Sequence, residues 1–137
     1  MSSMQISRET DYAIRCVLYL AKSYDEIVDV NEIADAREIP KSFLSKILQK
    51  LAKVNIVQSY RGLKGGFRLS RRPKDISLLD VIEVIEPVAL NRCAVNLHNC
   101  NQSKTCYGHL VWMDVRNDLK QRLKQYNFEN LINQAGA

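Results

Sequence analysis

The sequence predicts a mainly α-helical protein with one small β-hairpin. Apolar residues recur at every third or fourth position over most of the chain, which is the period of an amphipathic helix. Between residues 56 and 70 the pattern alternates instead, and three of the five glycines lie in the turn between the alternating stretches. With 137 residues, of which 46% are hydrophobic, the chain is expected to bury one core.

The first predicted helix covers residues 8–23. Ser7 suits its amino-terminal cap, and Glu9 and Asp11 place carboxylates in the first turn, where the helix dipole favours them. Apolar residues then follow at helical spacing, namely Ala13, Ile14, Val17, Leu18, Leu20 and Ala21. Residues 24–29 are expected to form a loop.

Two further helices are predicted close together. Asn31 is the expected cap of a short helix that contains Ile33, Ala34 and Ala36, and a turn follows at 37–39. Pro40 is expected at the first position of the next helix, residues 41–53. The inward face of that helix carries Phe43, Leu44, Ile47, Leu48 and Leu51. Two short helices joined by a tight turn form a helix-turn-helix.

The alternating stretches 56–60 and 67–70 are expected to pair as a hairpin around the turn 61–66. A helix-turn-helix followed by such a hairpin is a winged helix, with the hairpin as its wing. We assign residues 1–75 to this winged-helix region. Residues 76–137 form a second region, which holds three of the cysteines and the last long helix.

The second region begins with a helix over residues 77–86, which a capping box at Ser77 and Asp80 opens and Pro87 ends. A loop at 88–105 leads to a long helix at 106–125. One stripe follows this helix in steps of three or four, through Trp112, Val115, Leu119, Leu123 and Tyr126. The stripe packs either on the protein's own core or on the same helix of a second subunit, and we favour the second, a C2 homodimer.

The net charge of +5 is unevenly distributed. Residues 41–74 carry ten Lys and Arg and no Asp or Glu, whereas residues 1–40 have a net charge of −4 and residues 75–137 of −1. The basic segment covers the predicted third helix and the wing. Its natural partner is a polyanion, and double-stranded DNA suits a winged helix, which reads paired half-sites of a palindromic operator as a dimer.

The polar side of the third helix is expected to contact base edges, and the wing to contact the minor groove and phosphates. The candidate DNA-binding residues are Lys41, Ser42, Ser45, Lys46, Gln49, Arg61, Lys64 and Arg68. Arg71, Arg72 and Lys74 are further candidates for phosphate contacts.

Three cysteines, Cys93, Cys100 and Cys106, lie within fourteen residues in a polar loop, a spacing that lets thiolates converge on one metal centre. Cys16, the fourth cysteine, lies among apolar residues of a helix and is expected to be buried. His109 shares a helix face with Cys106 and is a candidate fourth ligand, as are Asp11 and His98. These donors suit structural zinc, an iron–sulfur cluster or a metal-free thiol switch.

Over nearly its whole length the chain resembles the iron–sulfur winged-helix repressors typified by IscR and NsrR. The resemblance is carried by residues 6–15 (ISRETDYAIR), 39–44 (IPKSFL) and 61–69 (RGLKGGFRL), and by the three-cysteine loop. It implies a transcriptional regulator, in most cases a repressor, whose DNA affinity depends on a cluster that senses redox state, nitric oxide or iron–sulfur supply.

The resemblance also bears on the ligands. The segment from Cys106 to His109 resembles the IscR pattern, in which that histidine binds a [2Fe–2S] cluster, and we favour this assignment. Asp11 matches the NsrR pattern, in which an aspartate of the partner subunit reaches a [4Fe–4S] cluster. Two features depart from IscR: the first cysteine spacing is one residue longer, and Ser45-Lys46 replaces Glu-Gln, so operator preference does not carry over.

Other classes of protein are disfavoured. No apolar run approaches the ~20 residues of a transmembrane helix, and the polar start is unlike a signal peptide, so a cytoplasmic protein is expected. With two histidines and no Gly-rich nucleotide loop, the chain offers little for a redox enzyme, and we expect no enzymatic activity.

Overall fold

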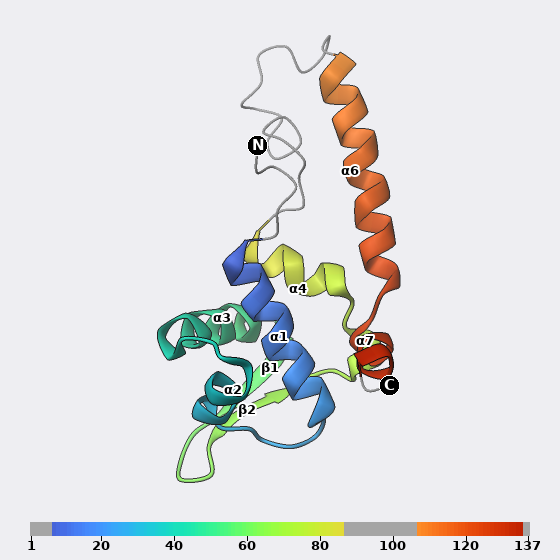
Figure 1. Ribbon diagram of the computed structural model, residues 1–137. Helices are drawn as coiled ribbons and strands as arrows, with labels where there is room; N and C mark the ends of the chain where they lie inside the picture. Colours follow the sequence, from blue (N-terminus) through green and yellow to red (C-terminus); the bar gives the residue numbers. More distant parts are fainter. Residues whose placement is uncertain (1–6, 87–106, 136–137) are drawn as a thin grey trace.

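The computed structural model describes residues 7–86 and 107–135. Its elements follow the chain in the order α1 (Arg8–Lys22), α2 (Val30–Arg37), α3 (Lys41–Lys53), β1 (Val57–Tyr60), β2 (Gly66–Leu69), the 3-10 turn η1 (Pro73–Asp75), α4 (Leu78–Ile85), α6 (Tyr107–Gln125) and α7 (Phe128–Ala135). Figure 1 shows α6 rising beyond the body that the other helices and the hairpin form. The predicted mainly helical, winged-helix fold is confirmed.

The helix starts follow local capping chemistry. Ser7 accepts a hydrogen bond from the Thr10 backbone amide at the start of α1, as predicted. The predicted capping box at the start of α4 is also present, between Ser77 and Asp80. The predicted cap of α2 is wrong, because Asp29 instead caps that helix and accepts from the Asn31 amide at 2.6 Å.

The start of α3 differs slightly from the prediction. Pro40 occupies the cap position with extended backbone, one residue before the first helical position. The fixed φ of proline suits either place, and its missing N–H costs nothing where a helix begins. The helix itself has the predicted bounds.

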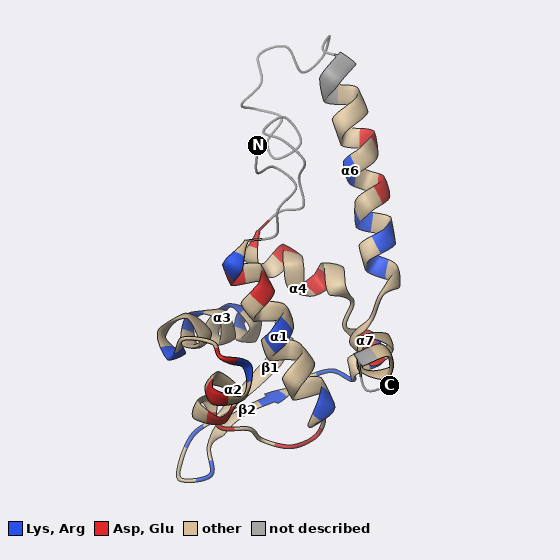
Figure 2. Cartoon of the chain, viewed as in Figure 1, with Lys and Arg blue, Asp and Glu red and all other residues tan. Residues whose placement is uncertain are grey.

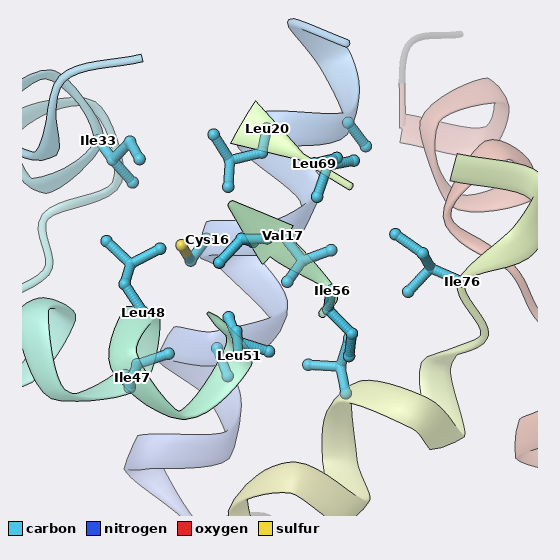
Figure 3. Packing of buried hydrophobic residues seen from close by; sticks show 14 of the residues in the cluster. Cys16, Val17, Leu20, Ile33, Ile47, Leu48, Leu51, Ile56, Leu69 and Ile76 are labelled. Carbon is cyan, nitrogen blue, oxygen red and sulfur yellow. The ribbon is translucent and has the colours of Figure 1, made fainter. Parts of the chain in front are cut away.

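A single large cluster of buried side chains forms the core, and α1 lies at its centre. Cys16 and Val17 of α1 pack against Leu48 and Leu51 of α3 (Figure 3), and none of these four side chains is exposed to solvent. Burial of Cys16 confirms its predicted role. The predicted inward position of Phe43 is wrong, because its side chain is 47% exposed and meets the Tyr12 ring edge-on.

The wing is a hairpin to which a third stretch of chain is bonded. β1 and β2 pair antiparallel, from Val57 opposite Leu69 to Tyr60 opposite Gly66. Val28, from the loop after α1, exchanges two backbone hydrogen bonds with Phe67, at 2.8 and 2.9 Å. A Cβ atom on Gly66 would lie 2.2 Å from the Val28 carbonyl oxygen, so only glycine permits this close approach.

The predicted stripe on α6 divides into two parts. Leu119 and Leu123 pack against Leu79 and Ile82 of α4. Nearer the start of the helix, Trp112 and Val115 of the stripe are 41% and 40% exposed, and Leu110 and Val111, which lie outside the stripe, are 58% and 56% exposed. One face of α6 is therefore covered by α4 only in its second half.

A final helix, α7, was not predicted from the sequence. Its Phe128 is fully buried in the same cluster as α1 and α3. Backbone bonds tie this end of the chain to the segment before α4, since Leu78 donates to Tyr126 and Phe128 donates to Ile76. The division of the chain after residue 75 stays a prediction about function, since Ile76 and Phe128 share the core of the first region.

Candidate nucleic-acid interface

The α2–α3 pair presents one polar face. Glu38 follows the last residue of α2, and its left-handed backbone turns the chain. Ile39 is then buried before α3 begins. The face of α3 that packs on α1 is fully buried and consists of Leu44, Ile47, Leu48 and Leu51. On the opposite face the predicted Lys41, Ser42, Lys46 and Gln49 are exposed and Ser45 is half-buried. The structure therefore brings the five predicted α3 residues to one side.

The wing carries the second group of predicted residues. Arg61 and Lys64 are exposed, and neither forms an ion pair within the part of the chain that the structure describes. Gly65 donates a backbone hydrogen bond to Gly62 at 3.0 Å, which closes the loop into a tight turn. At this tip Leu63 is fully exposed. Figure 2 shows Lys and Arg along α3 and on this loop.

Arg68 and Arg71 are engaged within the fold. The Arg68 guanidinium lies over the Tyr60 ring, 5.2 Å from its centroid, and 3.5 Å from an Asp25 carboxylate oxygen. Arg71 donates to the Val54 carbonyl at 3.1 Å, where α3 ends, and lies 4.0 Å from Asp80. Arg68 therefore ties the wing to the loop after α1, whereas Arg71 ties the segment after β2 to the end of α3 and to α4.

The first turn of α1 is contacted from two sides. Glu9 forms an ion pair with Lys50 of α3 at 2.7 Å. Thr10 donates through its hydroxyl to a Glu86 carboxylate oxygen at 2.7 Å, and the Ser7 amide approaches the same oxygen at 3.4 Å. The amino-terminal turn of α1 thus joins α3 to the carboxyl end of α4.

Glu86 is a residue that the sequence analysis missed. It is separated from Thr10 by 76 positions, so no local pattern connects the two. It lies immediately before residues 87–106, which contain the three loop cysteines. The hydrogen bond from Thr10 lowers the pKa of the Glu86 carboxyl, and partial burial opposes this effect more weakly.

The predicted cysteine ligands Cys93, Cys100 and Cys106 lie outside the described residues, as does His98. The backbone of His109 lies in the first turn of α6. Within residues 7–86 and 107–135, no group of three His, Cys, Asp or Glu could hold a metal ion.

Two described residues bear on the choice of ligands. Asp11 is half-exposed on α1 and forms an ion pair with Arg15 at 2.8 Å, so its carboxylate is accessible. Cys16 is fully buried, and burial raises the pKa of its thiol to about 12. A thiol of that pKa is not ionised near neutral pH, so Cys16 is unsuited to bind metal or to sense oxidants.

The fold and this surface define a winged-helix protein of the nucleic-acid-binding class. The Rrf2 family, described as iron-dependent transcriptional regulators, matches residues 6–134. The chain belongs to the Rrf2 family, whose members are transcriptional regulators and not enzymes. The resemblance inferred from the sequence is thereby confirmed. No helix in the described ranges is long and apolar enough to cross a membrane.

Similar proteins support this assignment. A putative HTH-type transcriptional regulator of Aquifex aeolicus is 32% identical over 133 residues, which cover 95% of this chain and 92% of that protein. The HTH-type regulator NsrR of Bacillus licheniformis is 37% identical over 84 residues, covering 61% of this chain and 59% of NsrR.

Two solved structures share the fold. IscR of T. potens has a TM-score of 0.78 and 22% identity, over 96% of this chain and 88% of that one. CymR, the global cysteine regulator of B. subtilis, has a TM-score of 0.76 and 24% identity, over 96% of this chain and 98% of CymR.

The Glu86 contact predicts a pH-dependent contribution to stability. Because folding lowers the pKa of this carboxyl, its charge stabilises the protein above the ordinary glutamate pKa of about 4.3, and the stabilisation is lost as the pH falls through the lower folded-state pKa. The urea midpoint of Glu86→Gln is expected below that of the wild type at pH 7, with the difference closing as the pH falls below the ordinary glutamate pKa and through the lower folded-state pKa. Glu26→Gln, on an exposed loop, is the control; a difference for Glu86→Gln that is constant with pH would contradict the role of the charge.

Proposed function

We propose that this protein is a homodimeric transcriptional regulator, acting as a repressor. It binds a palindromic operator in double-stranded DNA, and an iron–sulfur cluster controls its affinity. The observation that carries the DNA-binding part is the basic, outward face of α3 beside a wing whose Arg61 and Lys64 are unpaired within the described chain. Family membership supports the same conclusion.

In the proposed complex α3 enters the major groove. Lys41 and Ser42 lie at its amino-terminal end, which is the end that reaches base edges in helix-turn-helix proteins. Lys46 and Gln49 follow on the same exposed side, where an amide and an ammonium group can pair with purine edges and phosphates. Arg61 is placed to enter the adjacent minor groove, whose negative potential attracts cations.

Two wing substitutions test this arrangement. Arg61→Ala is expected to weaken operator binding about tenfold and to relax discrimination between operator and random DNA, because it removes a groove contact. Lys64→Ala is expected to reduce the slope of log K against log salt by about one, because it removes a phosphate contact. Fluorescence anisotropy over a salt series measures both effects. Lys124→Ala on α6 is the control; equal behaviour of all three variants would contradict wing docking.

The homodimer is supported by the first half of α6. Four apolar side chains there are exposed in the single chain, and α4 covers only the second half of the helix. Packing α6 on its copy around a two-fold axis would bury the face that carries Trp112 and Val115 on both subunits at once. To read a palindromic operator, such a dimer has to set its two α3 helices roughly 34 Å apart, the spacing of successive major grooves.

Trp112→Glu tests the dimer. A carboxylate at the centre of the apolar face would have to be desolvated in the dimer, so sedimentation velocity is expected to show monomer where the wild type shows dimer. Gln121→Glu, an exposed position on the same helix, should leave the dimer intact. A dimer that survives Trp112→Glu would move the interface elsewhere.

The donor set fits an iron–sulfur cluster. Cys93, Cys100 and Cys106 are the available thiols, because Cys16 is buried with a raised pKa, and His109 is the proposed fourth ligand. Three thiolates and one imidazole suit a [2Fe–2S] cluster. When bound, such a cluster supplies reactivity towards oxidants and nitric oxide and is lost when iron is short.

Contacts of the described residues supply a route from the cysteine segment to DNA. Glu86 lies next to that segment and holds the first turn of α1 through Thr10. Glu9 in the same turn holds Lys50 of α3. A change at the end of α4 would therefore shift the turn that supports the recognition helix, and a useful switch requires a coupling of only about 1–3 kcal/mol.

Anaerobic purification tests the cluster. The protein is expected to be coloured, with two or more irons per dimer, and Cys16→Ala should keep the colour. His109→Ala should weaken the cluster more than Asp11→Ala; the reverse result would assign the fourth ligand to Asp11. A colourless, zinc-containing or metal-free protein would contradict the cluster and favour a zinc-bound or thiol-switch regulator, while leaving DNA binding intact. The fold shared with the cysteine regulator CymR makes that outcome informative.

A further inference from the structure

The tip of the wing carries an apolar side chain that the fold does not use. Leu63 has a relative exposure of 107%, whereas the other exposed large hydrophobic residues in the described chain lie between 37% and 58%. It occupies a corner of the tight turn that the Gly65–Gly62 hydrogen bond closes. Polar residues, glycine and proline are the usual choices in such turns. Leu63 therefore contributes neither packing nor turn geometry.

The wing holds this tip in a fixed position. Val28 is hydrogen-bonded to Phe67 in both directions, and Gly66 allows the two backbones to meet. Arg68 adds a brace, through the Tyr60 ring on one side and Asp25 on the other. Because these contacts lie along the strands close to the turn, from Ser59 opposite Phe67 to Tyr60 opposite Gly66, they orient the tip while Leu63 itself stays fully exposed.

The charges beside Leu63 indicate the kind of surface that its side chain contacts. Arg61 and Lys64 flank it, are exposed, and form no ion pair within the described residues. An apolar side chain between two free cations matches the minor groove, where phosphates form the two rims and sugars and base edges form the walls and floor. The groove is only about 6 Å wide, and a two-residue turn is thin enough to enter it.

We infer that Leu63 is a specificity-determining contact that enters the minor groove and selects A·T over G·C pairs beneath the wing. Guanine places an amino group on the groove floor, and leucine can offer it no acceptor, so a G·C pair there would bury an unpaired donor. A·T pairs lack that group and present a smoother floor to the side chain. This inference rests on the proposed DNA binding and adds a source of sequence preference that is independent of α3.

The test begins with a duplex that the wild-type protein selects from a random-sequence pool. Hydroxyl-radical footprinting on that duplex locates the pairs under the wing. Leu63→Asn is nearly isosteric but polar, and Leu63→Met is the matched apolar control. Since the position is fully exposed, neither change should alter the melting temperature, which checks that both variants fold.

For the selected duplex, Leu63→Asn is expected to lose about five- to tenfold in affinity with an unchanged salt slope, and Leu63→Met to stay within about twofold. Changing the A·T pairs under the wing to G·C should weaken the wild type by a similar factor and hardly affect Leu63→Asn. Equal G·C penalties for the two proteins, or wild-type affinity in Leu63→Asn, would overturn the inference while DNA binding stands. If the wild type selects no duplex, DNA binding itself fails, and this inference fails with it.

Discussion

The buried face of α1 is the constraint on which the rest of the structure depends. Ala13, Cys16 and Val17 are fully buried, and the small size of the first two lets α3 approach closely. That approach orients α3, because the four apolar residues on its inner face are completely covered and only the polar side remains for DNA. The same packing removes Cys16 from redox chemistry. A position buried in this way cannot also serve as a sensor, so the proposed sensing rests on the cysteines of the loop.

Around this face, the amino-terminal turn of α1 works as a junction. Glu9, whose charge favours the helix start, also forms an ion pair with Lys50 of α3. Ser7 and Thr10, which form the cap, donate hydrogen bonds to Glu86 at the end of α4. One turn therefore both caps α1 locally and connects α1 to two helices that are distant in sequence. In the proposed regulator this connection would link the segment after α4 to α3, in addition to the Arg71 contacts with Val54 and Asp80.

Local patterns predicted the helices well, and they failed where a contact spans a long stretch of chain. The bounds of α3 and the capping box at Ser77 follow from periodicity and short-range hydrogen bonding, which are visible within a dozen residues. The bond between Val28 and Phe67 has no such signal, although Gly66 is the residue that permits it. For α7 a signal existed in the spacing of Phe128, Leu131 and Ile132, but it is only eight residues long and follows the end of α6 closely.

At the candidate interface, the sequence predicted where the basic side chains lie but not which of them form ion pairs within the fold. Basic side chains in the segment 41–74 were evident, yet three of the ten are paired in the structure, Lys50 with Glu9, Arg68 with Asp25 and Arg71 with Asp80. Their partners come from outside the basic segment, so only the fold could reveal them. The charge available to phosphates is therefore smaller than the sequence suggests, and it is concentrated on α3 and at the wing tip.

The acidic residues before α3 complete this arrangement. The stretch 25–38 carries six Asp and Glu and one Arg, and Figure 2 shows acidic residues on α2 beside the basic face of α3. Several of these acids make contacts that stabilise the fold: Asp29 caps α2, Glu32 accepts a hydrogen bond from Tyr19, and Asp25 forms an ion pair with Arg68. Their charge nevertheless repels phosphates, so a DNA duplex is disfavoured along α2 and favoured along α3 and the wing. In the proposed complex, the groups that stabilise the helix-turn-helix would therefore also restrict the direction from which DNA can approach, and this restriction would bring the wing tip, with Leu63 at its corner, to a groove.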